Sequence, residues 1–243
     1  MDGISLDEAL DKFRKSIDSK QFIPTRIDIP INTGLHMIER IGQMFKPKFV
    51  IDDLNRSAFE QLFWYFTGQF ENFTGDPEKG ILAVGNVGAG KTLAMVVMQH
   101  FLEFLEKSGH YVGIAFKPHY HIVKCNEIKS DFADQDIGGL KTLKPYKTRH
   151  VVYCFDDLGE EYNAKQPMAI HFGVQINVME NILTSRAELF KVHHTLTHCT
   201  SNYLIQSLDG SKKYFQDFYG KRVADRAAEM FNTIVFEGGS RRK

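Results

Sequence analysis

A glycine-rich turn between an apolar run and a helix is the feature that most constrains this fold. Residues 81–92 read ILAVGNVGAGKT and follow the pattern G-x-x-x-x-G-K-T from Gly85 to Thr92. Glycines permit backbone conformations that turn successive N–H groups inward around an anion. The apolar run 81–84 predicts a buried strand, and the apolar residues of 93–105 recur at mostly helical spacing. Strand, turn and helix in this order predict a phosphate-binding loop.

The residues of this loop have distinct expected roles at a nucleotide. Lys91 is expected to reach the outer phosphates. Thr92 is expected to ligate Mg²⁺ at the start of the helix, whose N-terminus adds partial positive charge. The other loop positions expected to contact the nucleotide are Gly85, Asn86, Val87, Gly88, Ala89 and Gly90.

Two adjacent carboxylates follow a second apolar run. Residues 151–155, VVYCF, predict a strand buried on both faces, which ends in Asp156 and Asp157. The carboxyl end of a central strand is the edge of an α/β sheet where ligands bind. We expect Asp156 to hold Mg²⁺ through water, and Asp157 to orient an attacking water as general base. The alternative is a strand end capped by acidic residues, but the phosphate loop upstream favours the catalytic roles.

A third strand is predicted at residues 194–199, and Asn202 follows it at the same edge of the sheet. Asn202 could fix the lytic water or contact the γ-phosphate, and the alternative is a simple turn. Near the end of the chain, a helix predicted at 221–230 places Arg222 and Arg226 on one face. Such arginines are usually solvated, but in nucleotide hydrolases they can reach a neighbouring subunit's γ-phosphate.

Composition limits the partners and the compartment. Lys+Arg and Asp+Glu are both 30, so any contact with DNA must be local or shared between subunits. The cysteines, Cys125, Cys154 and Cys199, form no C-x-x-C pair, which argues against a metal knuckle or a disulfide scaffold. No signal-peptide core or membrane-length apolar run is evident. We expect a reduced, cytoplasmic chain without a membrane partner.

An N-terminal arm, residues 1–50, is expected to precede an α/β domain at 51–243. In the arm the pattern predicts an amphipathic helix at 5–17, an extended connector at 22–34 and a helix at 35–44. The arm could pack on the domain or serve as a docking segment for a partner, because an amphipathic helix does not show what covers it.

Further elements are predicted between the motifs. A helix at 56–70, capped by Asp52 or Asp53, is rich in aromatic residues that favour core packing over base stacking. A strand is predicted at 111–116, His119 and His121 in a polar loop, and partly helical structure at 122–143. A helix at 170–186 and a last strand at 233–236 complete the chain.

Four motifs occur in an order that resembles the DnaC/IstB-like branch of the AAA+ ATPases, which comprises helicase loaders and transposition helper ATPases. They are GNVGAGKT, CFDDLGEE, HCTSN and YGKRVADRAAEMFNTIVFEGGSRR, and the resemblance covers roughly residues 55–242. It implies a P-loop NTPase fold with a five-stranded parallel sheet flanked by helices. Because few residues follow the last predicted strand, we expect no C-terminal helical lid domain.

The resemblance also assigns roles by position. Lys91 and Thr92 are similar to the Walker A pair, Asp156 and Asp157 to the Walker B pair, and Asn202 to sensor 1. Most AAA+ proteins carry glutamate where this chain has Asp157, although this branch commonly has Asp-Asp.

The same resemblance makes Arg226 the arginine finger, with Arg222 as its alternate, and Arg242 the late sensor arginine. It implies ATP and Mg²⁺ as ligands and ATP-dependent self-assembly through an intersubunit site. The expected partners are a replicative helicase or a transposase, and single- or double-stranded DNA bound weakly and only with ATP. The alternative function is a nucleotide-gated adaptor that binds ATP and a protein with little hydrolysis.

Overall fold

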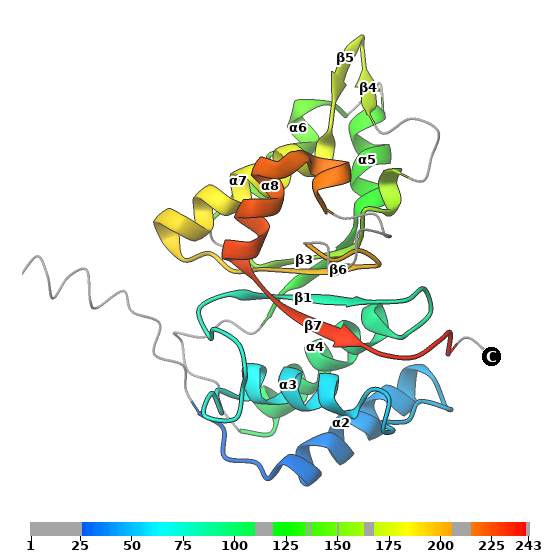
Figure 1. Cartoon of the computed structure of the whole chain (residues 1–243), viewed down its shortest axis with the longest axis vertical. Coiled ribbons are helices and arrows are strands. Elements are labelled where there is room, and N and C mark those ends of the chain that lie inside the picture. Colours follow the sequence, from blue (N-terminus) through cyan, green and yellow to red (C-terminus); the bar gives the residue numbers. More distant parts are fainter. Residues whose placement is uncertain are drawn as a thin grey trace, which may run out of the picture.

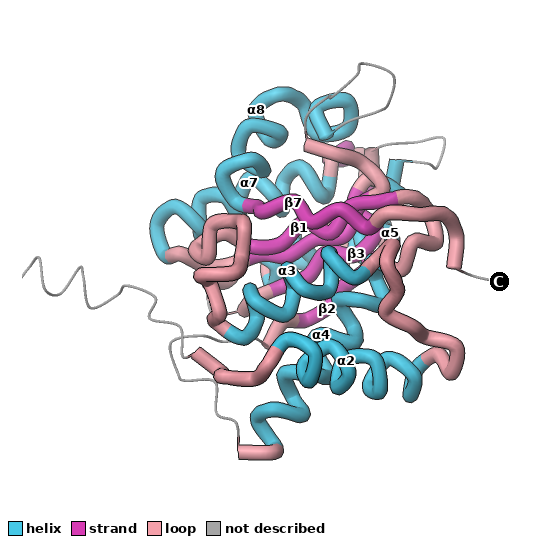
Figure 2. Tube along the Cα trace, turned by 60° about the horizontal axis from the view of Figure 1, so that its bottom comes forward, coloured by secondary structure: helices cyan, strands magenta, loops and turns pink. Residues whose placement is uncertain are grey.

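The computed structural model describes residues 26–109, 119–134, 136, 138–149, 151–162, 168–205 and 215–241. In this part of the chain a five-stranded sheet lies between two layers of helices (Figures 1 and 2). The strand order is β2-β3-β6-β1-β7, and every neighbouring pair is parallel. The strands are β1 (Gly80–Gly85), β2 (His121–Lys124), β3 (Tyr153–Leu158), β6 (Thr197–Ser201) and β7 (Phe231–Phe236). This confirms the predicted α/β class and five-stranded parallel sheet.

Helices cover both faces of the sheet. On one side lie α2 (Ile31–Phe45), α3 (Arg56–Thr67) and α4 (Lys91–Lys107), and on the other α5 (Cys125–Ala133), α7 (Val178–His193) and α8 (Phe215–Met230). The short elements are α6 (Leu140–Leu143), η1 (Pro145–Lys147), η2 (Glu160–Tyr162) and a hairpin of β4 (Ala169–His171) and β5 (Val174–Ile176). The described residues after β7 form no helix, and no described helix has the length and apolarity needed to cross a membrane.

Strand β1 divides the hydrophobic core into two halves. Ile81 and Ala83 belong to the half that contains α2, α3 and α4, whereas Leu82 and Val84 belong to the half that contains α5, α7 and α8. Successive side chains of a strand point to opposite faces, so a continuous apolar run fits a strand buried on both sides. The phosphate-loop motif therefore starts from a strand that is buried from Gly80 to Val84.

The aromatic helix α3 packs into the core, as its spacing predicted. Its buried residues include Phe59, Phe63, Tyr65 and Phe66. A Cβ on Gly34 of α2 would lie 2.1 Å from the Phe63 ring, so the two helices approach closely at this glycine. The described part of the predicted arm thus packs on the α/β domain, and its helix begins at residue 31 instead of 35. The predicted helix at 5–17 lies outside the described residues.

The start of α3 corrects one prediction. Neither Asp52 nor Asp53 caps this helix; Asn55 occupies the N-cap position. The Asn55 amide accepts a hydrogen bond from the Asp52 N–H at 2.8 Å and donates to the Val50 carbonyl at 3.1 Å. The Asp52 carboxylate pairs instead with Arg241, nearly two hundred residues away, a contact that local spacing does not reveal.

Two predictions of element type were wrong. Residues 121–124, expected to be loop and partly helical, form the edge strand β2, which is too short and half-exposed to show a clear alternation. The predicted strand at 111–116 lies outside the described residues. Residues 170–176 form the hairpin β4–β5 instead of the first half of a helix, because Phe172 and Gly173 turn the chain with positive φ angles of 46° and 80°.

Other boundaries moved by a few residues. The Asn177 side chain caps α7 by accepting from the Glu180 N–H at 3.1 Å, so this helix begins at residue 178. Strand β6 begins at residue 197, because His194 ends α7 in a left-handed conformation. Helix α8 begins at residue 215 and is interrupted by Gly220, whose φ is 75°.

Candidate nucleotide-binding site

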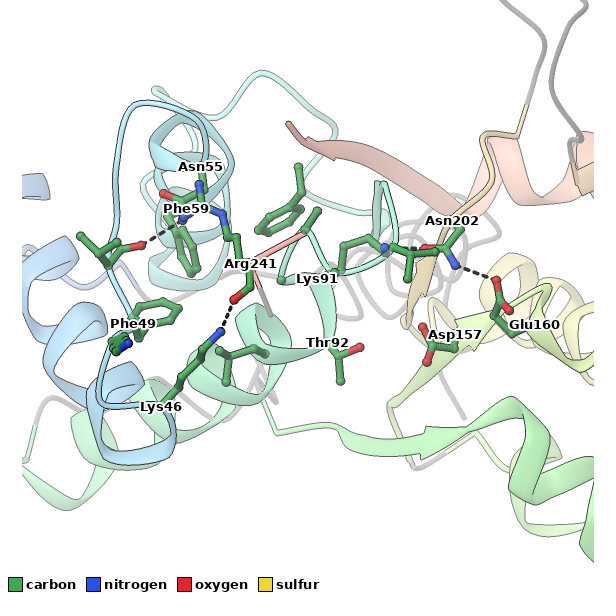
Figure 3. A pocket seen from close by; sticks show the side chains of 18 of the residues that line it. Lys46, Phe49, Asn55, Phe59, Lys91, Thr92, Asp157, Glu160, Asn202 and Arg241 are labelled. Carbon is green, nitrogen blue, oxygen red and sulfur yellow. Dashed lines mark hydrogen bonds between the residues drawn. The ribbon is translucent and has the colours of Figure 1, made fainter. Parts of the chain in front are cut away.

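A pocket of about 660 Å³ lies at the carboxyl edge of the sheet. It is bounded by the phosphate loop, the segment before α3, the end of β6 and the loop after β3 (Figure 3). This is the edge at which parallel α/β sheets bind ligands. The residues predicted from sequence that line it are Val87, Gly88, Ala89, Gly90, Lys91, Thr92, Asp157 and Asn202.

The loop backbone takes the conformations that its glycines permit. Gly88 has a φ of 82°, and a Cβ on it would lie 2.4 Å from the Ser240 hydroxyl oxygen. Gly90, at φ 102°, occupies the N-cap position of α4, where a side chain would be strained. Helix α4 starts at the next residue, so its free N–H groups and partial positive charge lie beside the loop. The arrangement suits an anion.

Lys91 is held inside the site. The residue is only 5% exposed. Its ammonium donates hydrogen bonds to the carbonyls of Gly85 and Asn86, at 2.9 and 3.0 Å. It also donates to Asn202 Oδ1 at 2.6 Å. An ammonium has three donors, so a phosphate oxygen can bind Lys91 by replacing one of these acceptors.

Oxygen atoms that could ligate Mg²⁺ lie together beside Lys91. The Thr92 hydroxyl donates to Asp156 Oδ1 at 2.7 Å, and the Thr200 hydroxyl donates to the same oxygen at 2.6 Å. Asp156 is 1% exposed. Since Mg²⁺ prefers oxygen ligands and keeps several waters, a hydroxyl and one carboxylate beside a phosphate site fit it. Among the described residues, no group of three or more His, Cys, Asp or Glu side chains is arranged so that it could hold a metal ion. His119 lies 2.9 Å from the Glu106 carboxylate.

Asp157 lies on a distorted stretch of β3. Its φ is 57°, unusual for a non-glycine residue, and the pairing of β3 with β6 shifts register between Phe155 and Leu158. The Asp157 N–H is fixed by the Thr200 hydroxyl at 2.9 Å. Bulges beside active sites commonly redirect a side chain, and here the side chain of Asp157 lines the pocket.

Glu160 lines the pocket but was not predicted from the sequence. Its Oε1 accepts a hydrogen bond from Asn202 Nδ2 at 2.6 Å. The next residue, Glu161, points inward instead and accepts from the Gly159 N–H at 2.9 Å and from the Tyr219 hydroxyl. Burial raises the pKa of Glu161, while the Tyr219 hydrogen bond opposes that shift. The only signal in the sequence was the pair of glutamates after D-D-L-G.

The far end of the pocket is formed by residues to which the sequence assigned no role in the site. They are Lys46, Lys48, Phe49, Val50, Asn55, Phe59, Phe236 and Arg241. Arg241 donates two hydrogen bonds to the Asp52 carboxylate, at 2.9 and 2.6 Å, and lowers the pKa of Asp52. Its backbone N–H donates to the Gly88 carbonyl at 2.9 Å, so the end of the described chain lies against the phosphate loop. Arg242, the expected sensor arginine, lies outside the described residues.

The two arginines of α8 do not line the pocket. Arg226 donates to the Thr184 carbonyl at 3.4 Å and lies 3.8 Å from the Glu188 carboxylate, both on α7. Arg222 is exposed. Their expected role toward a neighbouring subunit stays a prediction.

Comparison with known proteins gave matches only among solved structures. No protein-family model matches the chain, and no curated protein does. The structure is similar to one described as a primosome component from Streptococcus pyogenes serotype M3, with 21% identity over 79% of this chain and 84% of that chain and a TM-score of 0.49. It is similar to DnaI, with 23% identity over 79% and 87% of the two chains and a TM-score of 0.48. It is also similar to the DnaC helicase loader, with 17% identity over 79% and 95% and a TM-score of 0.46.

Proposed function

We propose that this chain binds ATP with Mg²⁺ in the pocket at the carboxyl edge of the sheet and hydrolyses it. One observation supports this above all. Side chains from three separate segments meet in one pocket beside the buried carboxylate of Asp156. They are Lys91 and Thr92 at the start of α4, Asp157 in β3 and Asn202 after β6. These residue types supply what phosphoryl transfer to water requires, namely charge neutralisation, a metal site and an oriented water.

Each of these residues would have its own role in ATP hydrolysis. Lys91 would neutralise charge on the outer phosphates, and Thr92 and Asp156 would hold Mg²⁺, which when bound offsets the negative charge of the triphosphate. Asp157 would orient the water and accept its proton. Asn202 would contact the γ-phosphate. The hydrogen bond from Lys91 to Asn202 Oδ1 supports this role, because Lys91 is the residue expected to bind the outer phosphates.

We further propose that the protein acts in DNA replication or transposition by ATP-dependent self-assembly, as a helicase-loader-like AAA+ protein. Arg226, or Arg222, would complete a neighbouring subunit's site, since neither lines the pocket of its own chain. A replicative helicase or transposase would be the protein partner. DNA binding would be weak and would strengthen on assembly, because the chain's formal net charge is zero.

The first test is ATP binding by a Lys91→Ala variant, measured by calorimetric titration. Replacing a buried ammonium that faces the phosphates is expected to weaken ATP binding by about 100-fold or more. The matched control is Lys107→Ala, which removes an exposed lysine from the opposite end of α4 and should leave the affinity unchanged. Equal affinities of wild type and Lys91→Ala would overturn the proposal. Phosphate release by the wild type then distinguishes a hydrolase from a nucleotide-gated adaptor.

A further inference from the structure

Both polar atoms of the Asn202 side-chain amide are hydrogen-bonded in the pocket. Its Oδ1 accepts from Lys91 and its Nδ2 donates to Glu160, each at 2.6 Å. Figure 3 shows these side chains in a row at one side of the pocket. An ammonium only donates and a carboxylate only accepts, so the amide satisfies both neighbours in one orientation and neither in the flipped one. Together, Lys91 and Glu160 therefore hold the amide in this one orientation.

The loop that carries Glu160 is itself fixed to the end of β6. The Ser201 hydroxyl donates to the Leu158 carbonyl at 2.6 Å. A Cβ on Gly159 would lie 2.6 Å from the Tyr203 ring, which shows how closely the two segments pack. Glu161 is buried and bound to Tyr219 of α8. Glu160 thus lies between two anchored residues, which limits its movement relative to Asn202.

We propose that Glu160 is a positioning residue for Asn202, and this rests on the proposed function. By accepting one hydrogen of Nδ2, Glu160 keeps the second amide hydrogen of Asn202 available to a γ-phosphate oxygen. Without Glu160, only the Lys91 bond to Oδ1 opposes a flip of the amide, and that bond would weaken when phosphate oxygens compete for Lys91. A flipped amide would turn its oxygen toward the phosphates, which replaces an attraction with a repulsion. Asp157 keeps its separate role toward the water.

This role makes a specific prediction for nucleotide selectivity. Asn202 would contact only the γ-phosphate, so Glu160→Ala should lower the affinity for a non-hydrolysable ATP analogue by about tenfold and leave ADP affinity unchanged. Glu160→Gln keeps an oxygen acceptor for Nδ2 and should retain the wild-type preference. Asn202→Ala should lose the preference to the same extent as Glu160→Ala. The double variant should lose no more than Asn202→Ala alone, because the two residues act as one unit.

The two substitutions at Glu160 distinguish a positioning role from a role of the carboxylate charge. If Glu160→Gln loses turnover and selectivity as fully as Glu160→Ala, the carboxylate acts through its charge or as a base, and the positioning role is wrong. Wild-type selectivity in Glu160→Ala would also overturn it. Thermal unfolding of each variant checks that the fold is retained.

A second readout needs no nucleotide. The side-chain amide of Asn202, identified in ¹⁵N–¹H spectra by its loss in Asn202→Ala, should shift in Glu160→Ala and stay near its wild-type position in Glu160→Gln. An unmoved signal in Glu160→Ala would refute the contact itself. Equal ATP binding by wild type and Lys91→Ala would instead refute the proposed function, so the two failures are distinguishable.

Discussion

His198 is a buried, neutral residue at the centre of the sheet. Its Nδ1 accepts a hydrogen bond from the Ile81 N–H at 3.0 Å, and its ring lies among those of Tyr65, Phe66 and Tyr120. Burial lowers the pKa of His198 to about 3, and the positive charge of Arg186 adds to this. The imidazole thus accepts a backbone hydrogen bond from the strand that leads into the phosphate loop.

This low pKa predicts a loss of stability in mild acid. The unfolded chain binds a proton at His198 below pH of about 6.5, whereas the folded chain does not until about pH 3, so stability falls as the pH falls between these values. At pH 5.5 the loss of stability from this residue is about 1.3 kcal/mol relative to pH of about 7. Urea unfolding of wild type and His198→Gln at several pH values measures it. The variant retains an acceptor but cannot titrate there, so equal pH slopes in the two proteins would contradict the prediction.

At the residue scale, the sequence was most informative where function depends on local spacing. Lys91 and Thr92 follow from a fixed loop pattern, and Asp156 and Asp157 from the end of an apolar run. Arg241 and Glu160 were missed because their place in the site depends on tertiary contacts, to Asp52 and to Asn202. The left-handed backbone of Asp157 is likewise set by the pairing of β3 with β6 and has no local signal.

Helix α8 contacts the loop after β3 through Tyr219 and carries two arginines, Arg222 and Arg226, on its other part. Tyr219, just before the break at Gly220, donates to Glu161, whereas Arg222 and Arg226 follow the break. Arg226 contacts α7 and has a side chain 24% exposed. Its ion pair with the largely exposed Glu188 is of a type that contributes little to stability, so Arg226 can exchange this partner for another.

The proposed finger role predicts a separation of binding from turnover. Arg226→Ala should bind ATP as the wild type does, since Arg226 does not line its own pocket, and should lose turnover by about 10³-fold or more. Lys221→Ala, which removes another exposed cation of α8 with no assigned role, is the matched control and should keep wild-type turnover. Arg222→Ala tests the alternate finger.

Mixing two inactive variants tests whether the finger acts between subunits. Arg226→Ala supplies an intact pocket, and Asp157→Asn supplies an intact arginine, so mixed assemblies should recover part of the ATPase activity. Absence of recovery at every mixing ratio would argue against an intersubunit site.

Elements were predictable where one periodicity dominated. The central strands β1 and β3 and the helices α3 and α4 have strong patterns and were found. Ile170 and Val174 fit a helix as well as a strand, and only the Phe172-Gly173 turn and the Asn177 cap decide for a hairpin followed by a helix. Strand β2 depends on pairing with β3, which its own four residues do not reveal.

In the whole molecule, the pocket is closed by parts of the chain far apart in sequence. The segment before α3 and the residues after β7 meet over the phosphate loop, joined by the Lys46 bond to the Arg241 carbonyl and the Arg241 pair with Asp52. The parallel sheet fixes the distances between the loop, the Asp pair and Asn202. The parallel topology of the sheet could be anticipated from the order of the motifs. The contact between the segment before α3 and the residues after β7 could not.

The most direct measurement is a crystal structure of the protein with Mg²⁺ and a non-hydrolysable ATP analogue. We expect the β- and γ-phosphates inside the loop, with an oxygen about 3 Å from Lys91 Nζ in place of one of its present acceptors, and Mg²⁺ bound to the Thr92 hydroxyl. An analogue bound away from the loop, with Lys91 still held by Gly85, Asn86 and Asn202, would contradict the proposed site.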